Sequence, residues 1–450
     1  MSSYGAKEQL TTQESANLIL QTPVMFKQPS SWSVVRLDFC LKENLRNGLY
    51  KPSEFLGKGQ AKLIEISTLY DCDRVLEVNS SLKSIVITED EERRYRVQDN
   101  DVLINRVSKR QEGVAQARIV RIISSWNQPV VFESNMLRAR LDAEKIIPDF
   151  FSFYASTTSY LIQVLSKAQK GNQTSINQPA LNSIILPLPP LPEQKTIAHT
   201  LRTIQKAKET RQRELELERE RKAALMQYLF THGTRNETRK QTEIGKIPES
   251  WEVVKLGEIC SISTGTTPST NKPEYYKGNI PFIKTAQIVN NKIYESDTYI
   301  SEQAVLNYNL KIYPPKTVFM AMYGQGKTRG QVALLEIGAA TTQNTAAIIP
   351  NYKIDSEFLW QYLMNQYEKL REAAHQGQIS HLNLGLVKQY KIALTSPEEQ
   401  IYITDILKNC DRKIQALEKE IALTDELFHA MLEQLMTGKI STQSLTETYV

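Results

Sequence analysis

The stretch LPPLPEQKTIAHTL, residues 188–201, decides how this chain folds, because a second stretch with the same pattern occurs later in the chain. A proline-rich segment ends in PEQ (192–194), and an apolar stripe then begins at Ile197 and Leu201. The stretch TSPEEQIYITDIL, residues 395–407, is built in the same way. Proline is tolerated in the first turn of a helix, and apolar residues three or four positions apart indicate its buried face. Two long helices that begin alike indicate a duplicated module.

The two modules align with an offset of 206 residues, the distance from Gln194 to Gln400. Upstream, PSSWSVVRLDFC (29–40) resembles PESWEVVKLGEIC (248–260), with small gaps between. A period of this length is far too long for a solenoid, whose repeats span roughly 20–50 residues. Each module therefore combines a globular part with one long helix.

The two helices are expected to pair with each other. In the second copy, apolar residues recur at alternating steps of four and three from Ile403 to Leu435, which is typical of a coiled coil. About 38 residues at about 1.5 Å each form a rod of roughly 55 Å. The first copy keeps this frame with a charged middle that includes Lys208 and Lys222, whose stems can cover apolar neighbours. Antiparallel pairing is the simplest closed arrangement, and the alternative is that each helix covers only its own globular domain. The expected inter-helix seam consists of Ile197, Leu201, Leu215, Leu225, Leu229, Leu407, Ile414, Leu417, Ile421, Phe428 and Met431.

The globular parts are rich in short β-stretches separated by turn signals, such as DVLINRV (101–107) and TVFMAMY (317–323). A helical pattern follows at 149–168 and at 356–374. The predicted class is α+β: two duplicated α/β domains separated by two long helices that form an antiparallel coiled coil with pseudo-twofold symmetry. The polar segment 232–247 is interpreted as the linker. The expected boundaries are 1–180 for domain 1, whose first ~28 residues form an arm, 181–235 for helical spacer 1, 236–388 for domain 2, 389–440 for helical spacer 2 and 441–450 for a tail.

Composition excludes several classes of protein. The chain is 41% hydrophobic and 23% charged, and no apolar run approaches the roughly 18 residues of a membrane span. The N-terminal residues lack the pattern of a signal peptide. Four scattered cysteines without a CxxC pair argue against a disulfide scaffold or a zinc site and predict a reducing cytoplasm. A net charge of +5 permits an acidic partner without requiring one.

Basic residues gather at the same repeat position in both copies. Residues 93–121 hold eight basic and three acidic side chains, and residues 303–335 hold four basic and no acidic ones. Each stretch contains a strand followed by a polar turn, NRVSKRQEG (105–113) or YGQGKTRG (323–330). Such loops can neutralise phosphates and contact base edges, although a solvated basic face is the alternative. The candidate DNA-binding residues are Arg93, Arg94, Arg96, Asn105, Arg106, Lys109, Arg110, Lys284, Gln287, Tyr323, Gln325, Lys327 and Arg329.

No catalytic or metal-binding pattern is found. AMYGQGKT (321–328) loosely matches a phosphate loop, but RGQVALLEIG (329–338) predicts a strand where such a loop requires a helix. The five histidines do not lie at ligand spacing with cysteines or acids. The turn KGNQTSIN (170–177) aligns with QGQISHLN (376–383), and its glycine is expected to cap the preceding helix in a left-handed conformation.

These features together resemble the specificity subunit of type I restriction–modification enzymes. The shared order is a W-x-V-V-x-L segment, a basic β-rich domain, a G-x-x-x-x-x-N turn and a P-x-x-E-Q helix start, all repeated once. The resemblance runs from Pro29 to about Gly438, and its most specific marks are PLPEQ (190–194) and PEEQ (397–400).

The resemblance implies that each globular domain is a target-recognition domain that binds one half of a bipartite site in double-stranded DNA. It implies that the paired helices act as a ruler and dock two modification subunits, and indirectly the restriction subunits. It also implies that this subunit has no catalysis or cofactor of its own. S-adenosylmethionine for adenine methylation, ATP and magnesium are expected on the partners, and no membrane is involved. The alternatives are a coiled-coil scaffold that binds protein but no DNA, and a nucleotide hydrolase that uses Lys327.

Overall fold

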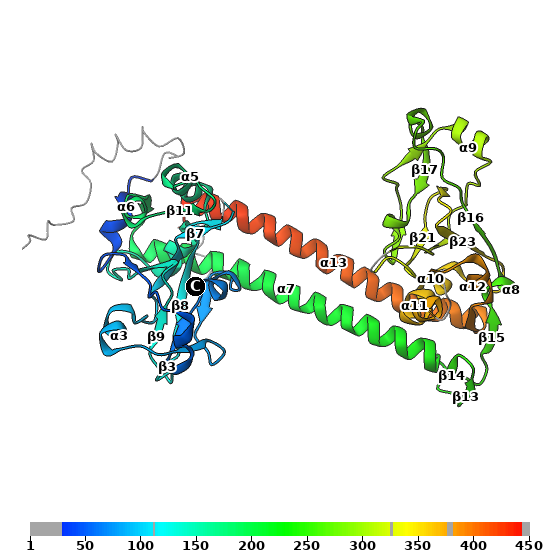
Figure 1. The fold of residues 1–450 in the computed structure, drawn as a ribbon, viewed down its shortest axis with the longest axis horizontal. Helices are drawn as coiled ribbons and strands as arrows, with labels where there is room; N and C mark the ends of the chain where they lie inside the picture. The colour runs from blue at the N-terminus through cyan, green and yellow to red at the C-terminus, as the bar shows by residue number, and fades with distance from the viewer. Residues whose placement is uncertain (1–28, 111–112, 325–326, 376–380, 443–450) are drawn as a thin grey trace, which may run out of the picture. The chain divides into compact units, whose positions relative to one another are not determined.

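The computed structural model describes residues 29–110, 113–324, 327–375 and 381–442 (Figure 1). The chain forms two compact units. Unit 1 consists of Met1–Thr210 with Ile421–Val450, and unit 2 consists of Arg211–Glu420. Each unit therefore contains the globular part of one copy together with a segment of both long helices.

Unit 1 contains a five-stranded sheet in the order β2-β10-β6-β8-β4 and a three-stranded sheet in the order β5-β3-β9. Neighbouring strands are antiparallel except for the pairs β4–β8 and β3–β9, which are parallel. Two further pairs, β1–β12 and β7–β11, are antiparallel. The strands are β1 Ser33–Arg36, β2 Arg46–Asn47, β3 Leu56–Ile64, β4 Val75–Glu77, β5 Lys83–Ile85, β6 Val102–Asn105, β7 Val107–Ser108, β8 Ala117–Arg121, β9 Val130–Phe132, β10 Met136–Ala139, β11 Thr174–Ser175 and β12 Ile185–Leu188.

Unit 2 repeats this topology. Its five-stranded sheet has the order β16-β23-β20-β21-β18, and its three-stranded sheet has the order β19-β17-β22. The parallel pairs are again the edge pair β18–β21 and the pair β17–β22, so the duplication seen in the sequence extends to strand order and direction. The strands are β13 Arg239–Thr242, β14 Gly245–Pro248, β15 Glu252–Lys255, β16 Cys260–Thr264, β17 Ile280–Ile283, β18 Asn291–Ile293, β19 Tyr299–Ile300, β20 Val318–Ala321, β21 Val332–Leu335, β22 Ala340–Thr341, β23 Thr345–Pro350 and β24 Lys391–Leu394.

The shorter helices differ from the sequence expectation in detail. Each helical pattern, 149–168 and 356–374, is divided into two helices, because Thr157 and Gln366 interrupt the run. Thr157 accepts a hydrogen bond from the backbone N–H of Tyr160 and so caps the second helix of the first pair. The helices of unit 1 are η1 Leu37–Cys40, η2 Ser53–Phe55, α2 Ile66–Tyr70, α3 Glu89–Tyr95, α4 Pro148–Tyr154, α5 Thr158–Lys167 and α6 Gln178–Asn182. Those of unit 2 are α8 Leu256–Ile259, η4 Pro273–Tyr276, η5 Thr285–Gln287, α9 Glu302–Tyr308, α10 Ser356–Asn365, α11 Tyr367–His375 and α12 Leu384–Gln389.

The segment interpreted as the linker contains the hairpin β13–β14, in which Arg239 pairs with Pro248. One smaller expectation was wrong. Gly171 is not among the residues with positive φ, so it is not a left-handed cap, and Gly377 lies outside the described residues. Left-handed glycines instead follow the long helices, at Gly233 with φ of 65° and at Gly438 with φ of 67°.

The long helices are α7, Leu191–His232, and α13, Pro397–Met436. Within unit 1 the beginning of α7 lies beside the end of α13, and within unit 2 the end of α7 lies beside the beginning of α13, so the helices run antiparallel (Figure 1). In unit 2 this direction follows from the ion pairs Arg211–Glu420 and Lys222–Asp411. The predicted antiparallel pairing is therefore present in both units.

Both helices also belong to the cores of the globular parts. In unit 1, Ile197 and Leu201 of α7 share one core with Phe428, Leu432 and Leu435 of α13. In unit 2, Leu229 and Phe230 of α7 share one core with Ile403 and Leu407 of α13. Each helix thus begins in the core of its own copy and ends in the core of the other copy. Helix pairing and domain covering, which the sequence presented as alternatives, occur together.

Candidate nucleic-acid interface

The loop after β6 is organised by one buried amide. Asn105 is fully buried, and its Nδ2 donates to the carbonyl oxygens of Gly113 at 2.6 Å and Val107 at 3.2 Å and to the hydroxyl of Tyr70 at 3.1 Å. Its Oδ1 accepts from the backbone N–H of Gln116 at 2.7 Å. Because these hydrogen bonds occupy the amide of Asn105 within the protein, its geometry is that of a residue that positions the basic loop and not of one that contacts a base.

Three segments of unit 1 meet at Arg106. Its backbone N–H donates to the carbonyl of Asn135 at 2.9 Å, and its own carbonyl accepts from the N–H of Ile176 at 2.9 Å. Its guanidinium reaches Oδ1 of Asn47 at 3.5 Å. The basic loop, the turn before β10 and the turn after α5 are thereby joined by main-chain hydrogen bonds, which position without depending on side-chain identity.

The same junction recurs in unit 2 at Met322. Its N–H donates to the carbonyl of Asn344 at 3.0 Å, and its carbonyl accepts from the N–H of Leu382 at 3.1 Å. Leu382 stands 206 residues after Ile176, which is the offset of the helices, whereas gaps in the repeat shift the two other residues of the junction. Two loops of different sequence are therefore held by the same pair of main-chain hydrogen bonds, an arrangement that allows the loop side chains to vary while their location is kept.

The predicted residues at these junctions differ in exposure. Lys109 and Arg110 are exposed and Arg106 is half-buried. In unit 2, Tyr323 stacks on His381 with ring centroids 4.4 Å apart, and Lys327 is exposed, whereas Arg329 is 7% exposed. Gln325 lies outside the described residues.

Helix α11 holds the loop after β20 in unit 2 through hydrogen bonds to its backbone. The Tyr367 hydroxyl donates to the carbonyl of Lys327 at 2.6 Å, and Arg371 donates to that hydroxyl at 3.0 Å and to the Arg329 carbonyl at 3.4 Å. The loop is followed by β21, antiparallel to β20, which agrees with the strand that was predicted in place of a phosphate-loop helix. No pattern in the sequence points to Tyr367 or Arg371, because only the fold brings them to the loop.

The remaining candidates lie elsewhere. Arg93, Arg94 and Arg96 are exposed on α3 or directly after it, and they form ion pairs there with Asp90 or Glu92. Lys284 and Gln287 follow β17, and Lys284 is exposed whereas Gln287 is half-buried. Because Ile283 of β17 pairs in parallel with Thr341 of β22, Lys284 lies just past the carboxyl end of the middle strand, beside the start of the Thr342–Thr345 turn. Direct contact of all these residues with DNA stays a prediction.

The seam residues vary in burial. Ile197, Leu201 and Leu407 are fully buried, and the charged middle of α7 forms ion pairs with α13. Lys222 Nζ lies 2.6 Å from Oδ1 of Asp411, and Lys208 pairs with Asp425. The others are buried (Leu215, Leu229, Leu417 and Phe428) or half-buried (Leu225, Ile414, Ile421 and Met431).

The repeated Glu-Gln pair at the start of each long helix forms a clamp. Gln194 accepts from the N–H of Ile147 at 2.9 Å and donates to the carbonyls of Lys145 and Pro189, both at 2.9 Å. Gln400 does the same with Asp355 at 2.8 Å, Lys353 at 3.0 Å and Thr395 at 2.8 Å. Each glutamine thus satisfies backbone groups just before α4 or α10 and just before its own long helix.

The preceding glutamate binds the tryptophan of the W-x-V-V segment. Trp32 Nε1 donates to Glu193 at 2.9 Å, and Trp251 Nε1 donates to Glu399 at 3.1 Å. The left-handed glycine that ends the antiparallel helix lies against the same indole ring in both units. A side chain on Gly233 would meet Glu399 Oε1 at 2.9 Å. The clamp therefore joins the beginning of one helix to the end of the other.

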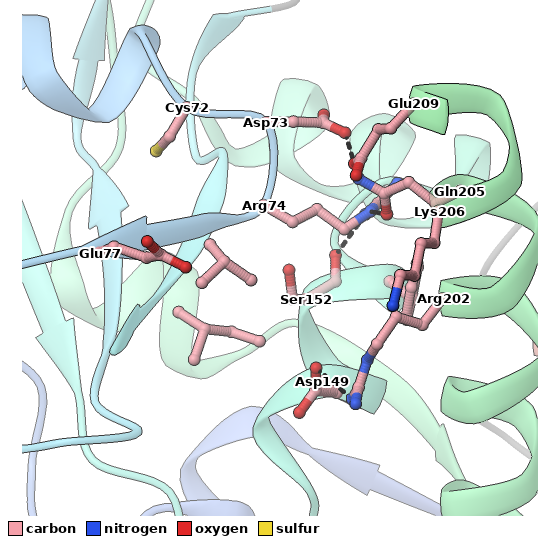
Figure 2. Close-up of a pocket in the computed structure, with 13 residues that line it drawn as sticks. Cys72, Asp73, Arg74, Glu77, Asp149, Ser152, Arg202, Gln205, Lys206 and Glu209 are labelled. Atoms are coloured by element: carbon pink, nitrogen blue, oxygen red, sulfur yellow. Dashed lines mark hydrogen bonds and ion pairs between the residues drawn. The ribbon is translucent and has the colours of Figure 1, made fainter. Parts of the chain in front are cut away.

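A cavity of about 490 Å³ opens between β4, α4 and α7 in unit 1 (Figure 2). Its lining mixes acids with Arg74, Arg202 and Lys206. Within the described residues, no three His, Cys, Asp or Glu side chains gather as a metal site would require. In the same part of the chain, none of the helices combines the length and apolar character needed to cross a bilayer.

Comparison with known proteins agrees with this architecture. A family model described as the type I restriction modification DNA specificity domain matches residues 29–219 and 248–424. The type I restriction enzyme MjaVIII specificity subunit of Methanocaldococcus jannaschii is 27% identical over 332 residues, which cover 70% of this chain and 75% of that protein. The putative MjaX specificity subunit of the same organism is 26% identical over 92% of this chain and 94% of its own length.

Solved structures share the fold at lower identity. A chain from a type I R-M system studied for complex assembly and conformational transition has a TM-score of 0.60 at 15% identity, over 92% of this chain and all (100%) of that one. The HsdS subunit from Thermoanaerobacter tengcongensis has a TM-score of 0.51 at 18% identity, over 92% of this chain and 99% of that one. Because the family model covers both copies, the chain belongs to the family of type I restriction modification DNA specificity domains.

Proposed function

We propose that this chain is the non-catalytic specificity subunit of a type I restriction–modification complex. Each recognition domain binds one half of a bipartite site in double-stranded DNA, and the paired helices set the spacing between the halves. The observation that carries the proposal is the repeated junction at Arg106 and Met322, which holds a basic loop in each copy. Exposed Lys109, Arg110 and Lys327 supply the charge that phosphate binding requires.

The long helices offer surfaces for partner subunits. Each carries large apolar side chains that are exposed, such as Leu217 and Tyr228 on α7 and Ile401 and Tyr402 on α13, between 51% and 60% exposed. Exposed apolar groups of this size gather at protein–protein interfaces. We infer that two modification subunits dock here and that restriction subunits join through them.

The chemistry belongs to those partners in this proposal. S-adenosylmethionine for adenine methylation binds to the modification subunits, and ATP and magnesium bind to the restriction subunits, with no cofactor on this chain. Four free cysteines, three of them buried, suit a reducing cytoplasm. The rival proposals are a protein scaffold that binds no DNA and a hydrolase that uses Lys327.

The test is a salt series of gel shifts with the full chain and its modification subunits, on duplexes that carry the bipartite motif. The motif itself is obtained by sequencing methylated adenines in the source genome. Replacing Lys109 or Lys327 by alanine should weaken binding to all sequences and lower the salt slope by about one. The matched controls are Lys42→Ala and Lys353→Ala, exposed lysines away from the two junctions.

Each alternative makes a different prediction. If the wild-type complex binds every sequence equally, the specificity role is refuted. If reversing the charge of Arg106, Lys109 and Arg110 leaves the function of the complex untouched and the wild-type complex shifts no duplex, the scaffold is favoured. If Lys327→Ala abolishes nucleotide hydrolysis by the isolated chain, the hydrolase is favoured.

A further inference from the structure

The connection between α2 and β4, residues 71–74, joins the first recognition domain to α7. It is called the arm below and is distinct from the N-terminal segment. Arg74 Nε donates to Oε1 of Gln205 on α7 at 3.1 Å (Figure 2). Its Nη1 donates to the Ser156 hydroxyl at 2.7 Å. Gln205 Nε2 returns a hydrogen bond to Oδ2 of Asp73 at 2.5 Å. The arm leads directly into β4, the edge strand of the five-stranded sheet. The edge of the sheet is thereby tied to the helix.

The arm is also packed between the two long helices and the recognition domain. The Arg74 guanidinium lies 4.3 Å from the ring centroid of Phe153 on α4 and 5.2 Å from that of Phe428 on α13. Burial lowers the pKa of Arg74 to about 10, which still leaves it charged at neutral pH. A charged, stacked and hydrogen-bonded arginine permits fewer orientations than an exposed ion pair does.

A second contact lies one helical turn away. Asp149 at the start of α4 is 9% exposed, and its two oxygens bind Arg202 of α7 at 2.6 Å and Arg121 of β8 at 2.9 Å. Arg202 and Gln205 therefore face the domain from adjacent positions on α7. Together the two contacts hold the domain on α7 at two positions about one helical turn apart.

The second unit makes contacts at the same two helix positions, 206 residues later. Lys408 lies 2.8 Å from Oε2 of Glu357, and Asp411 accepts from Gln361 Nε2 at 3.2 Å. Both partners there lie on α10. The recurrence of the two positions with different side chains indicates that the contact itself, and not a particular chemistry, is retained between the copies.

We propose that the Asp73–Arg74 arm and Asp149 are positioning residues, which hold the first recognition domain on α7 and so determine which spacer length between the half-sites is accepted. The inference rests on the proposed function. One added base pair moves a half-site by about 3.4 Å and turns it by about 35°. A domain that can pivot on the helix follows such a change, and a domain held at two points does not.

The test uses the full chain with its modification subunits and three duplexes with the same half-sites. The duplexes carry the genomic spacer or one that is shorter or longer by a base pair, and the readout is the relative methylation rate. Gln205→Ala and Arg74→Ala should lower the preference for the genomic spacer about five- to tenfold. Discrimination against a mismatch inside either half-site should stay as in the wild type. Gln227→Ala, the same change at an exposed position of α7, should alter neither ratio.

The outcomes separate the two proposals. Wild-type spacer preference in folded Arg74→Ala and Gln205→Ala overturns the positioning role. If Arg74→Ala does not fold, Gln205→Ala decides, because it removes only the hydrogen bonds to Asp73 and Arg74 and one to Glu209 from a helix that tolerates alanine. If both variants lose half-site discrimination as well, the arm has only a general structural role, which also overturns the inference. A wild-type complex that methylates no bipartite site refutes the proposed function instead.

Discussion

Glu399 is the residue on which the clamp of unit 2 depends, and Glu399→Gln tests it. The carboxylate is 3% exposed and accepts four hydrogen bonds. Thr234 donates twice to Oε1, from its N–H and its hydroxyl, both at 2.8 Å. Trp251 donates to Oε2 at 3.1 Å and Thr395 at 2.6 Å. An ionised carboxylate only accepts, so all four donors are satisfied at once.

A glutamine at this position can serve only one side of the clamp. If its oxygen stays with Thr234, its NH₂ faces the indole N–H, and two donors then oppose each other. Thr395 can rotate its hydroxyl to accept, but the fully buried Trp251 cannot. One unsatisfied buried donor costs about 1–3 kcal/mol, and the Thr234 bonds also lose their charge. We expect unit 2 to lose about 2–4 kcal/mol of unfolding free energy, which lowers its Tm by about 5–15 °C.

The effect should depend on pH. Burial acts to raise the pKa of Glu399, but the hydrogen bonds from Thr395, Thr234 and Trp251 outweigh it, and the pKa lies below the usual value. A depressed pKa means that the stabilisation is fully present above the unfolded value of about 4.3 and is lost as the pH falls through the folded pKa. The difference in Tm between wild type and Glu399→Gln should therefore narrow below about pH 4.

The assay is thermal unfolding followed by calorimetry and by tryptophan fluorescence. Glu398→Gln is the control, because it removes the same charge from the same helix turn at an exposed position. Glu193→Gln in unit 1 should have a smaller effect, since the carboxylate of Glu193 is half-buried and accepts from Trp32 and Thr442. A Glu399→Gln protein that melts with the wild type at pH 7 would refute the clamp as a source of stability.

Three further predictions concern the loop and the helices. Asn105→Ala should destabilise unit 1 by about 2–3 kcal/mol and weaken DNA binding, because the basic loop loses its internal hydrogen bonds; unchanged unfolding and binding would speak against it. A double-mutant cycle on Lys222 and Asp411, measured by urea unfolding, should give a coupling free energy of about 1 kcal/mol that shrinks at high salt. A coupling of zero would mean that this ion pair does not support helix pairing. Leu407→Ala should lower the unfolding free energy by about 2–5 kcal/mol, whereas the exposed Leu423→Ala on the same helix should change it little; equal effects would contradict the seam.

Several features could be predicted from local pattern alone. The offset of 206 residues, the heptad frame of 403–435 and the strand that follows 321–328 all depend on spacing along the chain. The spacing of apolar residues predicts helices and strands, because the periods of both elements are properties of the backbone. The α+β class, the duplication and the antiparallel helices were therefore predicted correctly.

Other features depend on contacts between distant residues, and no local pattern carries them. Asn105 looked like a base-contacting residue, but Tyr70, Gly113 and Gln116 enclose it. The break at Thr157 divides a helix that the apolar pattern presented as continuous. Glu399 and Gln400 marked the helix start, yet their roles appear only when Trp251 and Lys353 come within hydrogen-bond distance.

The sequence by itself determined that this protein is a duplicated α+β chain with two long helices, because periodicity and repetition are written along the backbone. Only the tertiary structure decided that each helix ends in the core of the other copy. Phe230 at the end of α7, for example, shares one core with Leu407 of α13. The tertiary structure also brings three separate segments together in each unit, at Arg106 and at Met322. The physical reason is that burial and hydrogen-bond satisfaction are settled by partners far apart in the chain, which spacing cannot identify.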